Sequence, residues 1–164
     1  MAINAFISFF DKAEGESIQK GKEKWVEIQG WDWEVEAESS WTKGAGASMG
    51  KPNPGNLHFI HRFDKSSTVV LGYICSGRAF PKLELHMMKT TGKGIPETYF
   101  TMTIEDVFVT RVSNSGAEDG AIFQRVEVVF KTVNIEYKTQ DNITGSFGVV
   151  GMFNWDIPSG KVSP

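Results

Sequence analysis

The side chains best suited to catalysis or metal binding are few and scattered. The three histidines are His58, His61 and His86, and the single cysteine is Cys75. His58 and His61 lie three positions apart in a segment with strand character. Successive strand side chains alternate between faces, so these two imidazoles are expected on opposite sides, unable to share one metal ion. No histidine or basic residue adjoins Cys75 in the sequence, which favours a buried structural thiol over a nucleophile.

Acid–base and phosphate chemistry have equally weak support. Two close carboxylate pairs are present, Asp32/Glu34 and Glu105/Asp106. Such pairs catalyse reactions only across a cleft, and a solvated face is their more common place. The glycine-rich segment GAGASMGK is followed by Pro52, where a phosphate loop needs Ser or Thr. The residues by themselves therefore indicate no catalytic residue, no cofactor and no metal site.

The composition is that of an ordinary globular protein. The chain has 164 residues, 40% hydrophobic and 23% charged, which suits one domain with a self-sufficient core. Its net charge of −3 gives no support to nucleic-acid binding. The apolar start MAINAFISFFDK has no basic region before it, so a secretory signal peptide is not expected. No apolar run approaches the roughly 18 residues of a membrane span, and one cysteine permits no internal disulfide.

One stretch, WVEIQGWDWEVEAE at residues 25–38, holds three of the five tryptophans. From residue 31 the side chains alternate, with Trp31, Trp33, Val35 and Ala37 on one side and Asp32, Glu34, Glu36 and Glu38 on the other. This period of two predicts a strand with one buried face and one wet, acidic face, and Gly30 predicts a bulge before it. The acidic face is either an ordinary solvated surface or the lining of a shared aqueous space.

The segment that follows, KGAGASMGKPNPGN at residues 43–56, carries four glycines and two prolines. It is unusually long for a connection within a compact domain. Loops of this length are usually functional or disordered.

Strand patterns dominate the rest of the chain. They cover residues 3–10, 25–29, 31–38, 57–62, 83–88, 99–111, 123–137 and 147–155. The apolar parity of the run 123–137 switches near Val133, which predicts a bulge there. One helix is predicted, with Asp64 or Ser66 as its N-cap and Gly77 as its stop. About eight strands and one helix favour a mainly-β, closed or nearly closed barrel, as a single domain over 1–157 with a flexible tail over 158–164.

The order and spacing of several motifs resemble one family across roughly residues 2–157. The motifs are Gly15-Glu16-Ser17, Trp25-Val-Glu-Ile, Trp31-x-Trp33, the loop 43–56, Asp64-Lys-Ser-Ser, Cys75-Ser-Gly77, Phe80-Pro-Lys82, the strand pair 97–112 and the run Val126–Tyr137. Together they resemble the Hcp family, the hemolysin-coregulated tube proteins of bacterial type VI secretion systems. At the C-terminal end, Phe153-Asn-Trp155-Asp stands where the family often has a tyrosine-containing strand.

The resemblance implies a small β-barrel of two antiparallel sheets with one α-helix, acting as a structural protein. Six copies would close into a hexameric ring, and rings would stack into a tube. The implied partners are further copies of the chain, a secretion spike protein, a contractile sheath and effector proteins carried inside the ring. Nucleic-acid binding, stable membrane insertion and cofactors are not implied. The protein would start in the bacterial cytoplasm and leave through type VI secretion without a signal peptide.

Two sets of residues become candidates for assembly and cargo binding under this resemblance. Trp31 and Trp33 are expected to fill the barrel core, and the opposite face, with Asp32, Glu34 and Glu36, is expected to line the lumen of the ring. The loop is expected to reach a neighbouring ring or subunit through Gly44, Gly46, Met49, Lys51, Pro52 and Pro54. An Hcp-like binding module outside any secretion tube is the main alternative, and a small hydrolase on a barrel scaffold is a third.

Overall fold

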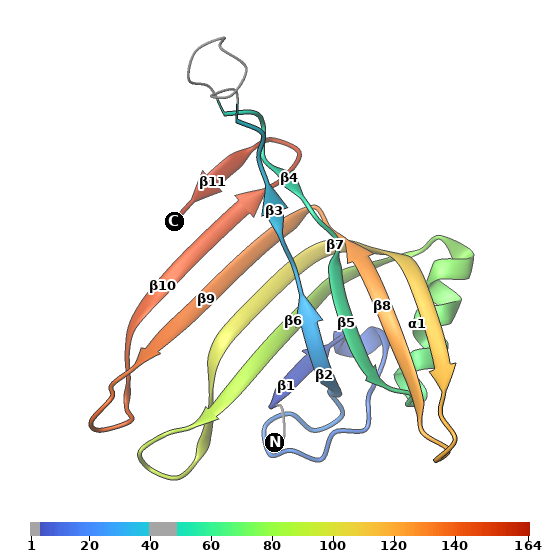
Figure 1. The fold of residues 1–164 in the computed structure, drawn as a ribbon, viewed down its shortest axis with the longest axis horizontal. Coiled ribbons are helices and arrows are strands. Elements are labelled where there is room, and N and C mark those ends of the chain that lie inside the picture. Colours follow the sequence, from blue (N-terminus) through green and yellow to red (C-terminus); the bar gives the residue numbers. More distant parts are fainter. Residues whose placement is uncertain (1–3, 40–48) are drawn as a thin grey trace.

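The alternating segments of the sequence form antiparallel strands of one sheet that curls on itself (Figure 1). The computed structural model describes residues 4–39 and 49–164. The strands are β1 (Ala5–Ser8), β2 (Val26–Asp32), β3 (Val35–Glu36), β4 (Asn53–Pro54), β5 (Leu57–Arg62), β6 (Ala79–Thr90), β7 (Pro96–Gly116), β8 (Ile122–Val129), β9 (Thr132–Gln140), β10 (Phe147–Asp156) and β11 (Lys161–Ser163). The helices are α1 (Lys65–Ser76) and a short 3-10 helix, η1 (Phe10–Lys12).

The strand order explains the shape. It runs β11-β10-β9-β7-β6-β1-β2-β5-β8, and β8 also pairs with β7, which closes six strands into a barrel. Strands β9, β10 and β11 continue the sheet beyond the barrel wall and form an extension on one side (Figure 1). Strands β3 and β4 form a separate two-stranded ribbon. The expected mainly-β barrel with one α-helix is therefore confirmed.

The barrel interior is filled by one apolar cluster. Phe9, Phe59 and Phe80 are almost completely buried, and the rings of Phe9 and Phe80 lie 4.9 Å apart. Helix α1 packs against this cluster through Val70, which is fully buried, and through Tyr73, whose ring stacks on Phe80 at 3.9 Å. The helix is thus held by packing of its apolar face.

Both predicted ends of the helix are confirmed. Asp64 is the N-cap, because its side chain accepts a hydrogen bond from the Ser66 amide at 2.9 Å, and Ser67 completes a capping box. Gly77 ends the helix in the left-handed conformation at φ 69°, with its N–H donating to the Tyr73 carbonyl.

The prediction of a buried Cys75 is wrong, because the thiol is exposed. Cys75 lies about 140° around the helix from Val70 at 3.6 residues per turn. It therefore falls on the side of α1 that faces away from the core. Spacing to the apolar residues, rather than the general tendency of cysteine to be buried, decides its position.

Two predicted interruptions of the strand patterns correspond to irregularities of the sheet. The register between β2 and β5 shifts between Ile28 and Gly30, which confirms the bulge at Gly30. The run 123–137 breaks at residues 130–131 into β8 and β9, slightly before the expected bulge. Both β8 and β9 pair with β7. Asp106 of β7 lies beside the break and has φ 52°. The break lets β8 pair with β5 and close the barrel, while β9 continues into the extension.

Two other predicted boundaries differ from the structure. The strand expected over 31–38 ends at Asp32, and Val35 is 44% exposed in the short ribbon strand β3. Alternation alone cannot show that neighbouring strands have ended. At the C-terminus, where a flexible tail was expected over 158–164, residues of β11 pair with Asn154–Asp156 of β10. A turn after Asp156 provides this hairpin, with Gly160 at φ 73°.

Candidate assembly surfaces

The two tryptophans that open the acidic stretch lie at the mouth of the barrel. Trp31 and Trp33 are half-buried beside the core, so the expectation that they fill it is wrong. Trp31 stacks on Phe100 at 5.3 Å, and its indole Nε1–H points to the sulfur of Met87 at 3.3 Å. The Trp33 indole donates to the Gly55 carbonyl at 3.1 Å. Trp33 thereby ties the segment before β3 to the segment after β4, at the base of the ribbon.

The outer face of β2, β5, β8 and β7 carries a row of ionisable side chains. Asp32 is in register with His58, His58 with Glu127, and Glu127 with Arg111. His58 Nδ1 lies 3.1 Å from Glu127 Oε1. The next row along the strands places Gly30, Ile60 and Arg125 side by side. Asp32 and Arg125 border one shallow hollow of about 200 Å³.

This face is therefore mixed in charge rather than acidic throughout. Of the three acidic candidates, Asp32 lies on this face at the end of β2, whereas Glu34 and Glu36 follow it into the exposed ribbon, and the arginines lie on the neighbouring strands. His58, Glu127 and Arg111 could not be recognised from the sequence as neighbours of Asp32, because the register between strands brings them together. The sequence does show ionisable residues at outward positions of these strands. Which of them become neighbours depends on how the strands pair, and the sequence does not show that pairing.

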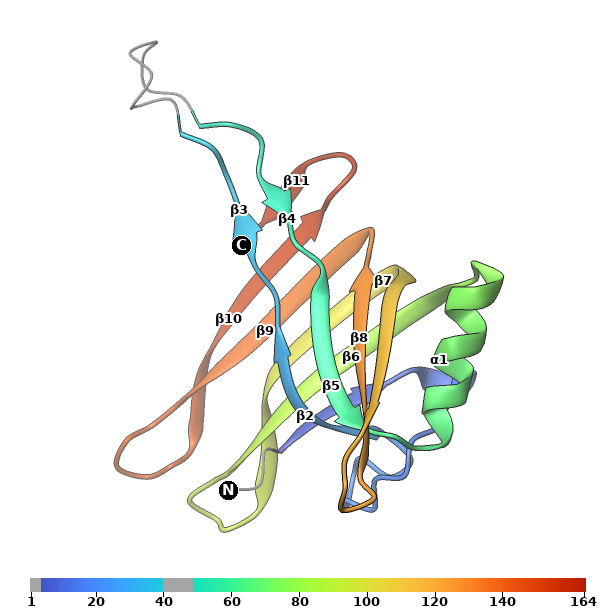
Figure 2. The same cartoon turned by 45° about the vertical axis from the view of Figure 1, so that its right-hand side comes forward.

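The β3–β4 ribbon projects beyond the end of the barrel (Figure 2). Val35 pairs with Pro54, and an isolated bridge joins Ser39 to Met49. Met49 is 65% exposed and Lys51 and Pro52 are exposed. Pro54 is half-buried at the base. Of the loop candidates, Gly44 and Gly46 lie outside the described residues.

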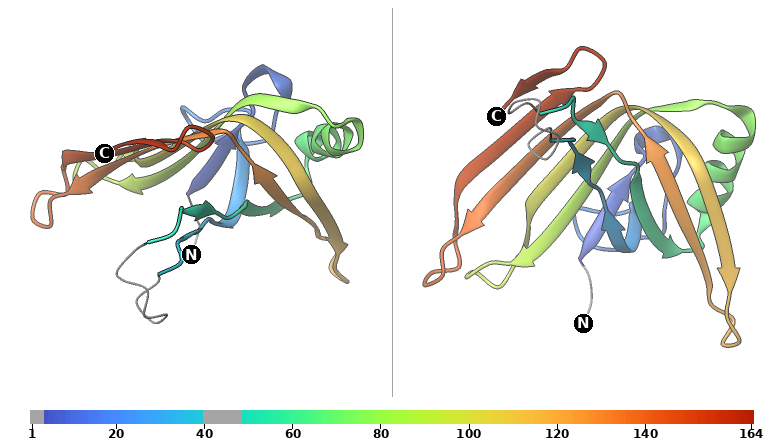
Figure 3. Two further views of the ribbon diagram at one scale, coloured as in Figure 1. Left: turned by 90° about the horizontal axis from the view of Figure 1, so that it is seen from above. Right: turned by 45° about the horizontal axis from the view of Figure 1, so that its top comes forward.

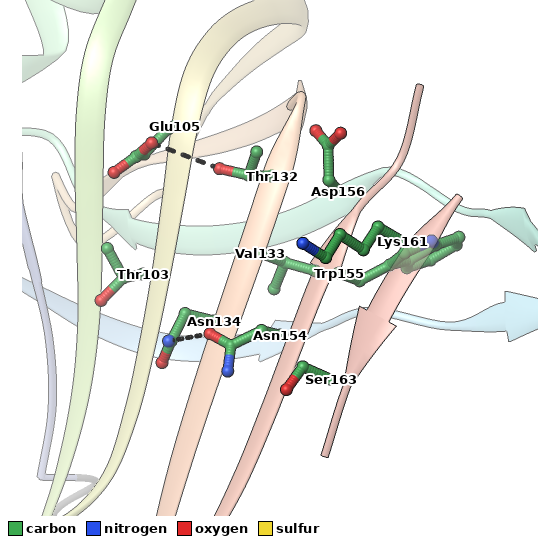
Figure 4. A pocket seen from close by; sticks show the side chains of 10 residues that line it. All are labelled: Thr103, Glu105, Thr132, Val133, Asn134, Asn154, Trp155, Asp156, Lys161 and Ser163. Carbon is green, nitrogen blue, oxygen red and sulfur yellow. Dashed lines mark hydrogen bonds between the residues drawn. The ribbon is translucent and has the colours of Figure 1, made fainter. Parts of the chain in front are cut away.

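A polar groove of about 340 Å³ crosses the extension (Figure 4). It lies on the face that continues the outer face of the barrel. Thr103, Asn134, Asn154 and Ser163 form one cross-strand row along it. The Asn134 amide donates to the Asn154 carbonyl oxygen, and the Thr132 hydroxyl lies 3.4 Å from a Glu105 oxygen. Two hydrogen bonds thus link four of the side chains that line the groove. The lining is polar, and neither of these bonds is that of a nucleophile to a base.

A buried polar cluster fixes the connection between η1 and β2 to the barrel. Lys22 is only 8% exposed, and its ammonium donates to His86 Nδ1 at 2.6 Å, so the imidazole proton belongs on Nε2. His86 Nε2 lies 3.3 Å from Glu84 Oε2, and Lys22 also lies over the Trp25 ring at 4.3 Å. Burial lowers the pKa of Lys22, against the opposing effect of the Glu84 carboxylate. The contacts of Lys22 with His86 and Trp25, and of His86 with Glu84, thus fix this connection to β6.

Replacing Glu84 with glutamine is expected to flatten the acid limb of the stability profile. The hydrogen bond from His86 lowers the pKa of Glu84 in the folded protein, with burial acting the other way. A carboxyl with a depressed folded pKa stabilises the fold above its unfolded pKa, and this contribution disappears as pH falls through the folded pKa. The unfolding free energy of Glu84→Gln should therefore fall less steeply in this acid range than that of the wild type. Urea titrations across the range measure both slopes, and equal slopes would contradict the expectation.

The described residues offer little for metal or covalent chemistry. His58 and His61 face opposite sides as predicted, with His58 on the outer face and His61 buried against Gln124 at 2.9 Å. Within residues 4–39 and 49–164, no three His, Cys, Asp or Glu side chains are grouped so that they could hold a metal ion. None of the helices in these ranges has the length and apolar character to cross a bilayer.

Comparison with known proteins gives this architecture a family. The sequence matches the family described as "Type VI secretion system effector, Hcp" over residues 6–137, which span the barrel and most of β9. The chain belongs to the Hcp family. This is a family of secreted tube proteins of type VI secretion systems rather than a known enzyme family.

Individual relatives resemble the chain over about two thirds to almost all of its length. Protein hcp1 of Pseudomonas aeruginosa is 30% identical over 159 residues, 96% of each chain. The "Major exported protein" of the same organism is 28% identical over 111 residues, 65% of this chain and 61% of its own length. A solved type six secretion system protein superposes with a TM-score of 0.89 at 26% identity, covering 99% of this chain and all of its own. Hcp1 from Salmonella typhimurium gives 0.78 at 30%, with the same coverage.

Proposed function

We propose that the protein is a structural subunit of the type VI inner tube, forming hexameric rings that stack and carry effector proteins. The observation that supports this most directly is the match to Hcp structures over 99% of the chain, extension included. A ring needs a contact between two different surfaces whose rotation closes, and stacking needs a second, head-to-tail contact. The native mass of the protein tests the ring, since an Hcp-like binding module outside a tube would remain monomeric.

The upper part of the β2–β5–β8 face is proposed to line the lumen. Asp32 is exposed at the end of β2, Glu34 is exposed between β2 and β3, and Glu36 is exposed in the ribbon strand β3. A concave surface of one sign raises the local concentration of oppositely charged ligands. The acidic end would favour basic segments of cargo, and Arg125 and Arg111 across the sheet would give the lower part a different preference.

Reversing the charges of Asp32 and Glu34 together is expected to weaken binding of a basic probe about tenfold or more. The probe is a fluorescent ten-residue lysine peptide, measured by anisotropy at low salt with the assembled protein. The same double change at Glu118 and Asp119, which are exposed in the β7–β8 turn, provides the control. Unchanged affinity of the Asp32→Lys/Glu34→Lys variant would remove the acidic end of this face as a cargo surface.

The ribbon and its loop are proposed to make the contact between rings or subunits. The ribbon leaves the barrel at one end and presents Met49, Lys51 and Pro52 to the surroundings, while Pro54 and Trp33 anchor its base (Figure 2). Residues Gly44 and Gly46 of the same loop are included in this proposal on sequence grounds alone.

Deleting residues 45–54 is expected to abolish tube formation while the barrel still folds. No core residue lies among residues 49–54, the described part of the deleted segment, so the far-ultraviolet circular dichroism and the melting transition should stay close to those of the wild type. Negative-stain images at high protein concentration distinguish tubes from single rings. Tubes of normal length from the deletion variant would show that the loop is dispensable for stacking.

A further inference from the structure

The connection between η1 and β2 forms backbone hydrogen bonds with itself rather than with the barrel. The Gly15 N–H donates to the Lys24 carbonyl at 2.7 Å, and the Lys24 N–H donates to the Ser17 carbonyl at 2.9 Å. Within the described chain, the backbone–backbone hydrogen bonds of residues 15–25 all end inside the same segment. We call residues 15–25 the lid. Because its backbone is satisfied internally, the lid can move away from the barrel as one unit.

The lid lies against an apolar side chain on the outside of the barrel. Ala5 and Ile7 of β1 belong to the core, so Phe6 between them points outward, yet it is only 3% exposed. Phe6 is in register with His86 of β6, and the Trp25 ring of the lid lies 4.7 Å from that imidazole. The segment from η1 to β2 projects from the side of the barrel opposite the ribbon (Figure 3). The lid therefore shields Phe6 from water.

One buried ammonium attaches the lid to the barrel wall. Lys22 is 8% exposed, and its Nζ lies 2.6 Å from His86 Nδ1. Among the described residues, this is the one side-chain hydrogen bond that joins the lid to a strand of the barrel. The other imidazole nitrogen, Nε2, lies 3.3 Å from a Glu84 oxygen. A nitrogen that accepts a hydrogen bond carries no proton, so the closed lid requires a neutral His86.

The surroundings of His86 provide no acceptor for a proton on Nδ1. The charged groups around the imidazole are Lys22 of the lid, Glu84 and Lys82 of β6 and, two strands away, the exposed Glu27 of β2. The residues in register with His86 on β1 and β7, Phe6 and Thr101, carry no charge. Glu84 lies on the Nε2 side of the ring. A protonated Nδ1 would therefore point its N–H directly at the Lys22 ammonium, and the two cations would repel each other.

We propose that acid opens the lid: protonation of His86 at Nδ1 expels the Lys22 ammonium and uncovers Phe6 and Trp25 on the outer wall of the barrel. The closed state holds a neutral imidazole and the open state accepts one more proton. A state that binds one more proton is favoured as pH falls, by at most about tenfold per pH unit. Opening also returns Lys22 to water, and burial is what lowers the pKa of this amine in the closed state. The lid goes beyond the proposed tube, since it would act in a single copy of the chain.

Hydrogen exchange of the full chain at about pH 7.5 and about pH 5.5, read by mass spectrometry of peptic peptides, tests the proposal. Both values lie above the range near 4 in which carboxyl groups usually titrate, so histidines dominate the change. After correction for the intrinsic effect of pH, peptides from the lid should exchange about tenfold faster or more in acid. Peptides from β6 and β8 should change little. A lid that changes no more than these strands would overturn the proposal.

Replacing His86 with glutamine gives a lid that cannot titrate. The glutamine amide has an oxygen to accept from Lys22 and an N–H to donate to Glu84, so the lid should stay closed at both pH values. The matched control is His58→Gln, because His58 also lies beside a carboxylate, 3.1 Å from Glu127, but on β5. The control should open in acid like the wild type. Acid opening that survives in His86→Gln, or that disappears in His58→Gln, would contradict the assignment to His86.

Replacing Lys22 with methionine separates attachment from titration. The variant lacks the ammonium that holds the lid, so its lid peptides should exchange fast at both pH values. Anilinonaphthalene sulfonate, a dye that fluoresces on apolar surfaces, should bind the wild type more strongly in acid and Lys22→Met equally at both values. A Lys22→Met lid as protected as that of the wild type at about pH 7.5 would show that Lys22 does not hold it. The wild-type comparison between the two pH values decides the matter even where a variant fails to fold.

Discussion

Replacing Phe80 with alanine is expected to lower the free energy of unfolding by about 3–5 kcal/mol. The Phe80 side chain has no solvent exposure. It joins β6, to which it belongs, to Phe9 at 4.9 Å and to Tyr73 of α1, on which it stacks at 3.9 Å. Removing the ring leaves a cavity that these neighbours cannot collapse into without moving the helix. Domains are typically stable by only 5–15 kcal/mol, so the loss is a large part of the total.

The matched control is Phe10→Ala, which removes the same ring from a side chain that is 43% exposed. Its cost should be well under that of Phe80→Ala, because little apolar surface returns to water. Urea unfolding at low protein concentration, followed by tryptophan fluorescence, measures both. Similar losses for the two variants would mean that Phe80 is not the centre of the packing between helix and barrel.

Substituting alanine for Gly15 is expected to destabilise the protein, whereas the same change at Gly72 should stabilise it. A Cβ on Gly15 would lie 2.4 Å from the carbonyl oxygen of Trp25, so the backbone must separate at a cost of about 1–3 kcal/mol. At Gly72, in the exposed middle of α1, a Cβ meets nothing within 4 Å. Alanine there should add about 0.5–1 kcal/mol through its helix propensity.

The opposite signs make this pair of glycine variants informative. Gly15 lies in the connection before β2, where the chain folds back against residues 24 and 25. The Gly15 N–H donates to the Lys24 carbonyl at 2.7 Å, and the Ser17 N–H donates to the Trp25 carbonyl at 3.0 Å. This close approach gives a physical reason for the Gly15-Glu16-Ser17 motif. Thermal melts of both variants under identical conditions decide the matter, and a Gly15→Ala protein as stable as the wild type would show that the connection does not need this contact.

Local sequence signals were sufficient for the features that depend on neighbouring residues in the chain. The helix ends at Asp64 and Gly77 could be predicted because capping is a local interaction. The bulge at Gly30 and the break between β8 and β9 at residues 130–131 also follow from local breaks in alternation. The mainly-β barrel could be predicted because period-2 segments with one short helix leave few alternatives.

Features that depend on distant strands could not be predicted from the residues themselves. The pattern of Trp31 to Glu38 is that of a long half-buried strand, yet the barrel ends at Asp32 and the tryptophans close its mouth. The neighbours of Asp32, namely His58, Glu127 and Arg111, come from three other strands whose register is set by the whole sheet. Similarly, the pairing of β11 with β10 requires a free strand edge, which the sequence does not reveal.

Family membership and physical chemistry contribute different parts of the account. Membership of the Hcp family accounts for the barrel and its extension as the fold of a type VI secretion protein. Phe108, Val129, Tyr137 and Val162 are apolar side chains that the fold leaves exposed. Exposed apolar surface on a secreted barrel is costly unless another surface covers it.

The measurement that tests the central claim most directly is the native mass of the full chain. Light scattering on a sizing column gives the mass, and negative-stain images of the same peak give the shape. We predict six times the 18.2 kDa chain mass and a ring with an open centre. A single monomeric peak at high concentration would contradict the tube-subunit account and leave an Hcp-like barrel that works alone.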